Sequence, residues 1–291
     1  MTYILRPVAS LRSSSAIVLI GCGGTGGYIA EGICRLFIDE PDVNLHLIDH
    51  DRIEEHNLRR QNFFPSELGE FKSKALAERL SRQFDRPIAY SIYPVLAPRV
   101  GYSESFLGMG TFNVPEIVIA AVDNARARHA IAASHRGMGW LIDAGNGDEW
   151  GQVLIGNGRV IDRPFSSRAA PPQKVGDGWA MSDNPGVVHA LPLPTEQLPE
   201  LLVTNEAPVP LDCAEAVISG DQSATINQLM AGLALDMVRK LMNGTLTWMG
   251  LYADFRNGTM RPMAATPENA ARYWHCRPQD LVERNAKAKE A

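Results

Sequence analysis

The sequence predicts an α/β fold, with a mostly parallel sheet, helices on both faces of that sheet and an antiparallel extension near the C-terminus. The first observation is the stretch 16–51, which has the pattern strand, glycine turn, helix, strand, acid. The second is a set of short apolar runs typical of buried parallel strands, found at 17–20, 45–48, 116–122 and 140–144. The third is the pair of alternating runs within 248–262, which predicts an antiparallel hairpin.

Composition fits an ordinary globular protein and excludes several classes. The 291 residues are 45% hydrophobic and 21% charged, with a formal net charge of −5. No basic stripe, membrane-length apolar run or secretory signal pattern is present, so we expect no nucleic-acid or membrane partner and a cytoplasmic location. The four cysteines form no C-x-x-C pair, which argues against a disulfide framework and a four-thiolate zinc site.

The order of periodic and proline-rich stretches predicts one domain with an inserted segment. A polar lead-in precedes the domain, a charged tail follows it, and a proline-rich stretch interrupts it. A helix is expected over 223–243, apolar around much of its circumference and therefore buried, and a second hairpin is expected around 156–158. The expected divisions are a lead-in at 1–15, a single domain at 16–276 made of halves 16–162 and 213–276 joined by 163–212, and a tail at 277–291.

A glycine-rich loop follows the first strand of the domain. Gly21, Gly23 and Gly26 match G-x-G-x-x-G, a pattern that permits a tight turn and lets backbone N–H groups approach a phosphate. Asp49 ends the next strand, where a carboxylate can hold ribose hydroxyls. The motif fits NAD as well as ATP, and a purely structural glycine turn is the alternative.

Further polar groups are expected at the same edge of the sheet, because ligands of open α/β sheets bind outside the carboxyl ends of the strands. A polar cluster with sequence NLRRQ occupies 57–61, and Asp123-Asn124 follows a buried strand. Lys72 and Lys74 lie in the first turn of a helix, a position that the helix dipole disfavours for cations unless they face an anion. Lys74 is the stronger candidate for such a contact, and Lys72 is evenly divided between solvent and ligand.

Five motifs together resemble one family. They are GCGGTG at 21–26, Asp49 with Asp51, NLRRQ at 57–61, Lys74, and Asp123-Asn124 with Arg128. In this order the chain resembles the ubiquitin-activating-enzyme-like adenylyltransferases of the ThiF/MoeB/HesA family, and within it the ThiF-like branch of plasmid-associated PRTRC gene sets. Gly24 supplies the extra glycine of the family loop. Further along, DCAEAV around Cys213, the following helix and LYADF occupy later family positions, and 163–212 corresponds to the family's crossover loop.

The resemblance implies a Rossmann-like fold and a specific chemistry. Known members use ATP and Mg²⁺ to adenylylate the C-terminal carboxylate of a small β-grasp, ubiquitin-like protein that ends in Gly-Gly. Some members then transfer the acyl group to a cysteine, and members are commonly homodimers. Many bacterial relatives carry two C-x-x-C pairs for structural zinc; this chain lacks both, so we expect no such zinc.

The resemblance assigns roles around the phosphates and the ribose. Arg60 and Lys74 would face the phosphates, and Asn57 and Gln61 would hydrogen-bond phosphate or ribose. Asp49 would hold the ribose. Positioned cations suit this chemistry, because attack on the α-phosphate builds negative charge.

Asp123 would be the Mg²⁺ ligand, with Asn124 beside it at the cofactor. Asp51 is equally consistent with a metal-assisting role and with a structural cap. Arg128 would brace the turn that carries Asp123.

Cys213 would be the acyl acceptor if the reaction continues beyond the adenylate. A lone cysteine is more often a small buried apolar residue, and Cys22 and Cys34 are expected to be that. Cys276 lies beside His275 without further metal ligands nearby in the sequence. Arg6 and Arg12 are candidates for the arginine that family members take from the other subunit.

Two other readings remain open. An NAD-dependent oxidoreductase would explain the glycine loop and Asp49 but gives no reason for Arg60, Lys74 and Asp123 to converge. A non-catalytic scaffold would bind a partner without turnover and would not need the full polar set.

Overall fold

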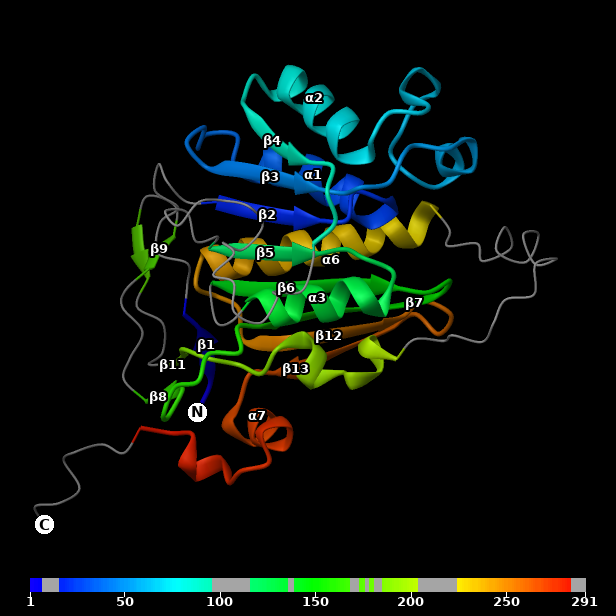
Figure 1. Cartoon of the computed structure of the whole chain (residues 1–291). Coiled ribbons are helices and arrows are strands. Elements are labelled where there is room, and N and C mark those ends of the chain that lie inside the picture. Colours follow the sequence, from blue (N-terminus) through cyan, green and yellow to red (C-terminus); the bar gives the residue numbers. More distant parts are fainter. Residues whose placement is uncertain are drawn as a thin grey trace, which may run out of the picture.

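The computed structural model describes residues 1–6, 16–95, 116–135, 139–167, 173–175, 178–180, 185–203 and 224–283. Its centre is an eight-stranded sheet with the order β13-β12-β7-β6-β5-β2-β3-β4 (Figure 1). The strands β4, β3, β2, β5 and β6 run parallel, whereas β7, β12 and β13 continue the sheet antiparallel. The strand bounds are β2 Ala16–Ile20, β3 Asn44–Ile48, β4 Ile88–Ser91, β5 Ile117–Ala120, β6 Trp140–Asn146, β7 Trp150–Gly156, β12 Trp248–Asp254 and β13 Thr259–Ala264.

Helices cover both faces of this sheet because its parallel strands are apolar on both sides. Ile17 and Leu19 of β2 belong to the core cluster shared with α1, α2 and α6, and Val18 and Ile20 belong to a second cluster that contains Ile131 of α3. Alternate side chains of one strand therefore pack against the helices on opposite faces of the sheet. The helix bounds are α1 Gly24–Leu36, α2 Lys72–Phe84, α3 Ala125–His135, α4 Pro194–Gln197, α6 Ala224–Met242 and α7 Pro267–Trp274, and the short 3-10 helices are η1 Glu55–Arg59, η2 Pro65–Glu67, η4 Pro199–Leu202 and η5 Pro278–Asp280.

Two smaller sheets complete the described fold. β1 (Tyr3–Leu5) pairs parallel with β11 (Gly186–Val188), and β11 pairs antiparallel with β8 (Phe165–Ser166). A two-stranded ladder joins β9 (Gln173–Val175) and β10 (Gly178–Ala180).

The strand β1 is hydrogen-bonded to other segments of the same chain. Leu5 is fully buried, and its N–H donates to the carbonyl oxygen of Leu246 at 2.9 Å. The N–H of Arg6 donates to the carbonyl oxygen of Val188 at 2.8 Å, which places Arg6 beside the small sheet. Arg12 lies outside the described residues.

The predicted fold class is confirmed: a Rossmann-like, mostly parallel sheet with helices on both faces and an antiparallel extension. The hairpin expected around 156–158 is wrong. The side chain of Asn157 is buried, donates to the carbonyl of His189 at 3.0 Å and accepts from the N–H of Leu191 at 3.1 Å. The Gly-Asn-Gly turn therefore carries the chain toward residues 189–191 and not back into a second strand.

The long helix α6 is less buried than its composition predicts. Its buried side includes Ile226, Met230 and Met237, but Leu229 is 48% exposed and Gly232 faces open space. None of the helices in the described ranges is long and apolar enough to cross a bilayer.

Candidate functional site

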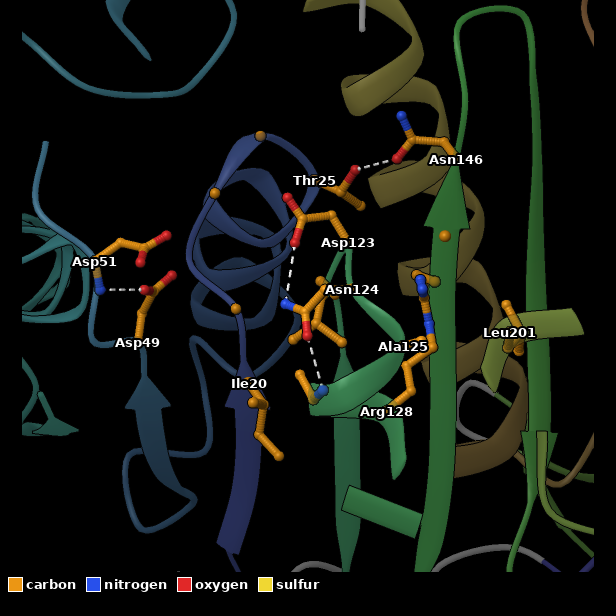
Figure 2. A pocket seen from close by; sticks show the side chains of 18 of the residues that line it. Ile20, Thr25, Asp49, Asp51, Asp123, Asn124, Ala125, Arg128, Asn146 and Leu201 are labelled. Carbon is orange, nitrogen blue, oxygen red and sulfur yellow. Dashed lines mark hydrogen bonds between the residues drawn. The ribbon is translucent and has the colours of Figure 1, made fainter. Parts of the chain in front are cut away.

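A cavity of about 440 Å³ opens at the carboxyl ends of β2, β3, β5 and β6 (Figure 2). This is the edge where the strand order reverses, between β2 and β5, and it is the position at which open α/β sheets bind ligands. The volume falls in the range usual for small-molecule sites. Four segments follow these strands into the cavity wall, at 20–25, 48–51, 121–128 and 144–146.

The glycine loop has the geometry that its sequence predicts at two positions. Gly21 has φ +91, and a Cβ there would lie 2.5 Å from the carbonyl oxygen of Ala121. A Cβ on Gly26 would lie 1.8 Å from the carbonyl oxygen of Gly21. Side chains are excluded at both positions, so the loop turns tightly into α1. α1 begins at Gly24 after a glycine cap, with no side-chain cap hydrogen bond, and Gly24 and Thr25 line the cavity, so this helix start is available to an anion.

Asp49 fastens this loop to β3. One carboxylate oxygen accepts from the N–H of Cys22 at 2.7 Å, and the other accepts from the N–H of Asp51 at 2.8 Å. Asp49 is 9% exposed, and burial raises its pKa above the ordinary value although both hydrogen bonds act in the opposite direction. Asp49 also lines the cavity, and the contact of its carboxylate with a ribose stays a prediction.

The lysine at the cavity is Lys72, and Lys74 lies elsewhere. Lys72 is 7% exposed, lines the cavity and places its Nζ 3.0 Å from Oδ2 of Asp51. The Nζ of Lys74 instead lies 2.8 Å from Glu70 and 3.8 Å from Glu78 on the outer side of α2. The assignment of Lys74 to the phosphates therefore does not fit the structure. Positions 72, 76 and 80 share the buried side of α2, and position 74 does not.

The NLRRQ segment divides between structure and site. Asn57 is 3% exposed, and its Oδ1 accepts from the N–H of Glu54 at 3.0 Å, which caps η1. Asn57 lines a small hollow that shares Asp51 and Lys72 with the main cavity, so the predicted ligand contact of Asn57 stays a prediction. Arg60 and Gln61 do line the main cavity. Gln61 lies over Gly23, and its buried Oε1 has no hydrogen-bond partner among the described residues.

Asp123 and Asn124 lie beside the glycine loop, just after the neighbouring strand β5 (Figure 2). Asn124 caps α3 by accepting from the N–H of Ala127 at 2.8 Å, and its Nδ2 donates to Oδ1 of Asp123 at 3.3 Å. The exposed carboxylate of Asp123 is of the kind that Mg²⁺ prefers. Asp51 pairs with Lys72 through Oδ2, and a role of its carboxylate at the metal stays a prediction.

Arg128 braces the floor of the cavity from α3. Its Nε lies 3.0 Å from Oδ2 of Asp143 on β6, and both side chains are buried. Burial raises the pKa of Asp143, and the neighbouring guanidinium opposes that shift. The pair ties α3 to the sheet directly below Asp123, as predicted for a bracing residue.

Sequence reasoning missed two parts of the site. Glu200, Leu201 and Val203 close one side of the cavity from η4 and its end, inside the segment that was expected to be a crossover loop. Asn227 of α6 is fully buried and reaches the glycine loop. A polar residue within the buried side of an apolar helix is the signal that could have found Asn227.

The cysteines differ sharply in environment. Cys22 and Cys34 are buried, and burial raises the pKa of Cys22 well above its usual range and that of Cys34 to about 11, as expected of packing residues. Cys276 is exposed. Cys213 lies outside the described residues.

The cavity wall therefore combines three features. A glycine turn and a helix start can receive phosphate groups. Arg60 and Lys72 supply positive charge at the same edge, and Asp123 supplies an exposed carboxylate. This arrangement can bind a nucleoside triphosphate with its metal and stabilise charge that develops on a phosphorus centre.

Curated relatives match parts of the chain. Ubiquitin-like modifier-activating enzyme 5 of Rattus norvegicus is 29% identical over 134 residues, which cover 43% of this chain and 32% of that protein. The SUMO-activating enzyme subunit uba-2 of Caenorhabditis elegans is 29% identical over 164 residues, covering 54% and 27%. The ATP-dependent ubiquitin transferase-like protein Cap2 of Vibrio cholerae is 39% identical over 75 residues, covering 26% and 13%. The matched stretches thus span about a third or less of these relatives.

Solved structures extend the likeness of fold to most of the chain. PaaA aligns over 87% of this chain and 73% of its own, with 15% identity and a TM-score of 0.55. E. coli MccB with AMPCPP and MccA aligns over 88% and 66%, with 15% identity and a TM-score of 0.51. The ThiF family model matches residues 7–247, which is most of the sequence. With the glycine loop, the switch-point cavity and this match in place, the chain belongs to the ThiF family.

Proposed function

We propose that this protein adenylylates the C-terminal carboxylate of a small ubiquitin-like protein at the expense of ATP. The observation that carries the proposal is the convergence of the glycine loop, Arg60, Lys72 and Asp123 on one cavity. Relatives named as activating enzymes for ubiquitin-like modifiers support the choice of substrate class. A carboxylate substrate needs such a site, because it is a poor acyl donor until it gains a good leaving group.

The chemistry is an in-line displacement at the α-phosphorus. A carboxylate oxygen of the partner forms a bond to that phosphorus, the bond to the bridging oxygen breaks, and pyrophosphate leaves with the electron pair. Negative charge spreads over the phosphate oxygens during this step, and Arg60 and Lys72, which line the cavity, would stabilise it. The carboxylate of Asp123 would hold Mg²⁺, which neutralises triphosphate charge when bound.

The partner's tail would approach on the side of β6, β7 and η4. Trp150 is 57% exposed at this rim, and Gln152, Leu201 and Val203 continue the wall inward. A second fate for the adenylate, transfer to Cys213, is part of the proposal and is tested separately below.

ATP–pyrophosphate exchange is the direct test of the adenylation step. The chain is incubated with ATP, Mg²⁺, labelled pyrophosphate and a small ubiquitin-like protein ending in Gly-Gly, ideally one encoded in the same gene neighbourhood. We expect exchange that depends on the partner and disappears when its two terminal glycines are removed. Asp123→Asn should abolish exchange while the protein remains folded, and Asp42→Asn, an exposed aspartate just before β3, serves as the matched control.

The outcomes separate the three readings. Exchange that persists without the terminal glycines would contradict the requirement for a Gly-Gly end, and exchange without any partner would contradict the partner's carboxylate as the substrate. A rise in melting temperature with NAD but not with ATP would favour the oxidoreductase. Binding of ATP and of the partner with no exchange would favour a non-catalytic scaffold.

A further inference from the structure

We infer that Asn227 is a positioning residue that fixes both the glycine loop and the backbone of Arg60 for nucleotide binding. The inference deepens the proposed function, on which it rests only for the identity of the nucleotide. Asn227 lies in the first turn of α6, far from the glycine loop in sequence, and is fully buried at the junction of α6, α1 and β6.

Both Nδ2 and Oδ1 of Asn227 form hydrogen bonds. Its Nδ2 donates to the carbonyl oxygen of Arg60 at 3.2 Å. Its Oδ1 accepts from Nδ2 of Asn146 at 3.2 Å and lies 3.3 Å from the hydroxyl of Thr25. The hydroxyl of Thr25 is also 3.0 Å from Oδ1 of Asn146, and Figure 2 shows these two side chains pointing toward each other. A buried network of this kind fixes a geometry because each lost bond leaves a polar group unsatisfied.

The backbone of Arg60 is thereby held from two sides. Its N–H donates to the carbonyl oxygen of Asn57 at 3.1 Å, and its carbonyl accepts from Asn227. With both backbone groups fixed, the Cα–Cβ bond of Arg60 is held in one direction, at a residue that lines the cavity. Asn227 therefore acts on the nucleotide through Arg60 and not by contact.

Asn227 also packs against Gly24 of the glycine loop. A Cβ on Gly24 would lie 2.2 Å from Nδ2 and 2.6 Å from Cγ of Asn227, and the three nearest heavy atoms all belong to Asn227. Gly24 has no positive φ, so its backbone does not require glycine. The requirement for glycine at position 24 comes from Asn227, which makes the two residues a matched pair.

The pair can be tested without any nucleotide, by thermal unfolding of single and double variants. We expect Gly24→Ala to lower the melting temperature in the native background. In the Asn227→Ala background the same change should not lower it, because the clashing atoms are gone and alanine suits a helix better than glycine. Asn227→Asp keeps the shape, so Gly24→Ala should still destabilise that variant. Equal effects of Gly24→Ala in all three backgrounds would overturn the contact.

The positioning role is tested by the dissociation constant for ATP, measured by calorimetry well below the melting temperature. Asn227→Ala should raise it about tenfold, which corresponds to about 1.4 kcal/mol. Asn227→Asp should raise it similarly, because the donor to Arg60 is lost although the shape is kept. Asn243→Ala, an exposed asparagine just past the other end of α6, should leave it unchanged.

Each outcome decides between the two claims. Native affinity for ATP in Asn227→Ala would overturn the positioning role, even if the unfolding data confirm the contact. ATP binding by the native chain with no pyrophosphate exchange would overturn the proposed function alone. No ATP binding by the native chain would overturn both.

Discussion

Replacing Lys72 and Lys74 one at a time gives the sharpest test of the site, because two lysines of one helical turn have opposite environments. The side chain of Lys72 is 9% exposed and ends at the cavity beside Asp51, whereas that of Lys74 is 34% exposed and ends between Glu70 and Glu78. Lys72→Met and Lys74→Met remove the same ammonium and keep the aliphatic stem.

The expected magnitude follows from what each ammonium touches. Loss of one positioned donor at a developing phosphate charge costs roughly 10²–10³ in rate, which is the effect expected for Lys72→Met. The fold should tolerate this change, since methionine keeps the buried aliphatic stem and the carboxylate of Asp51, whose side chain is 54% exposed, stays solvated without the ammonium. Lys74→Met should leave the exchange rate within about twofold, because only solvent-exposed pairs on the helix surface are lost.

The assay is initial-rate pyrophosphate exchange at saturating partner, with ATP varied. Circular dichroism and a melting curve confirm that both variants are folded. A larger loss for Lys74→Met than for Lys72→Met would refute the assignment and restore the expectation drawn from sequence. Equal, small losses would show that neither lysine faces the triphosphate.

Gly26→Ala should destabilise the protein by about 3 kcal/mol or more in urea unfolding, because the new Cβ meets a backbone oxygen at 1.8 Å, whereas Gly232→Ala, which faces open space on α6, should stabilise it by about 0.5–1 kcal/mol; a destabilised Gly232→Ala would contradict this reading of the helix surface. Burial lowers the pKa of His135 from 6.5 to about 4. As the pH falls below about 6.5, His135 of the unfolded chain therefore binds a proton, whereas His135 of the folded chain stays neutral. Stability should therefore fall by about 1.4 kcal/mol from about pH 7.5 to about pH 5.5 on this account, and His135→Gln should remove that part of the slope; an unchanged slope would place the titration elsewhere. Cys213→Ala should retain exchange and lose a thiol-sensitive adduct with the partner on gel electrophoresis, and Cys276→Ala should keep both; an adduct that survives Cys213→Ala would assign the nucleophile to another residue.

The fold and the nucleotide edge could be predicted because their signals are local. The parallel strands are continuous apolar runs, and a polar residue directly after such a strand has only one edge of the sheet to face. This reasoning placed Asp49, Asp123 and the glycine loop on the cavity wall from adjacent residues alone.

The choice between the two lysines required the helix face, which the sequence did contain. Lys72 lies on the same side of α2 as Leu76 and Leu80, which are fully buried. Reading the first turn by its dipole alone gave no preference between the two positions, and the 3.6-residue period does.

The parts that the sequence left undecided come from contacts between distant segments. Asn57 carries an amide that can cap a 3-10 helix as well as bind a ligand, and the sequence does not say which. Glu200 and Leu201 reach the cavity from a proline-rich stretch without periodicity. The helical pattern marks Asn227 as a polar residue on the buried side of α6, but it does not say that the residue meets the glycine loop, a contact between segments far apart in the sequence.

The small strand at residues 3–5 has a consequence for the order of folding. Tyr3 pairs with Gly186 and Leu5 with Val188, whereas the parallel strands β2, β3 and β4 find their neighbours within a much shorter stretch of chain. Pairings between segments so distant in sequence form slowly, because a large loop must close first. During synthesis, β1 must therefore wait until β11 has emerged, while the nucleotide-binding strands can already assemble. Residues 3–5 are therefore among the last segments of the fold to pair.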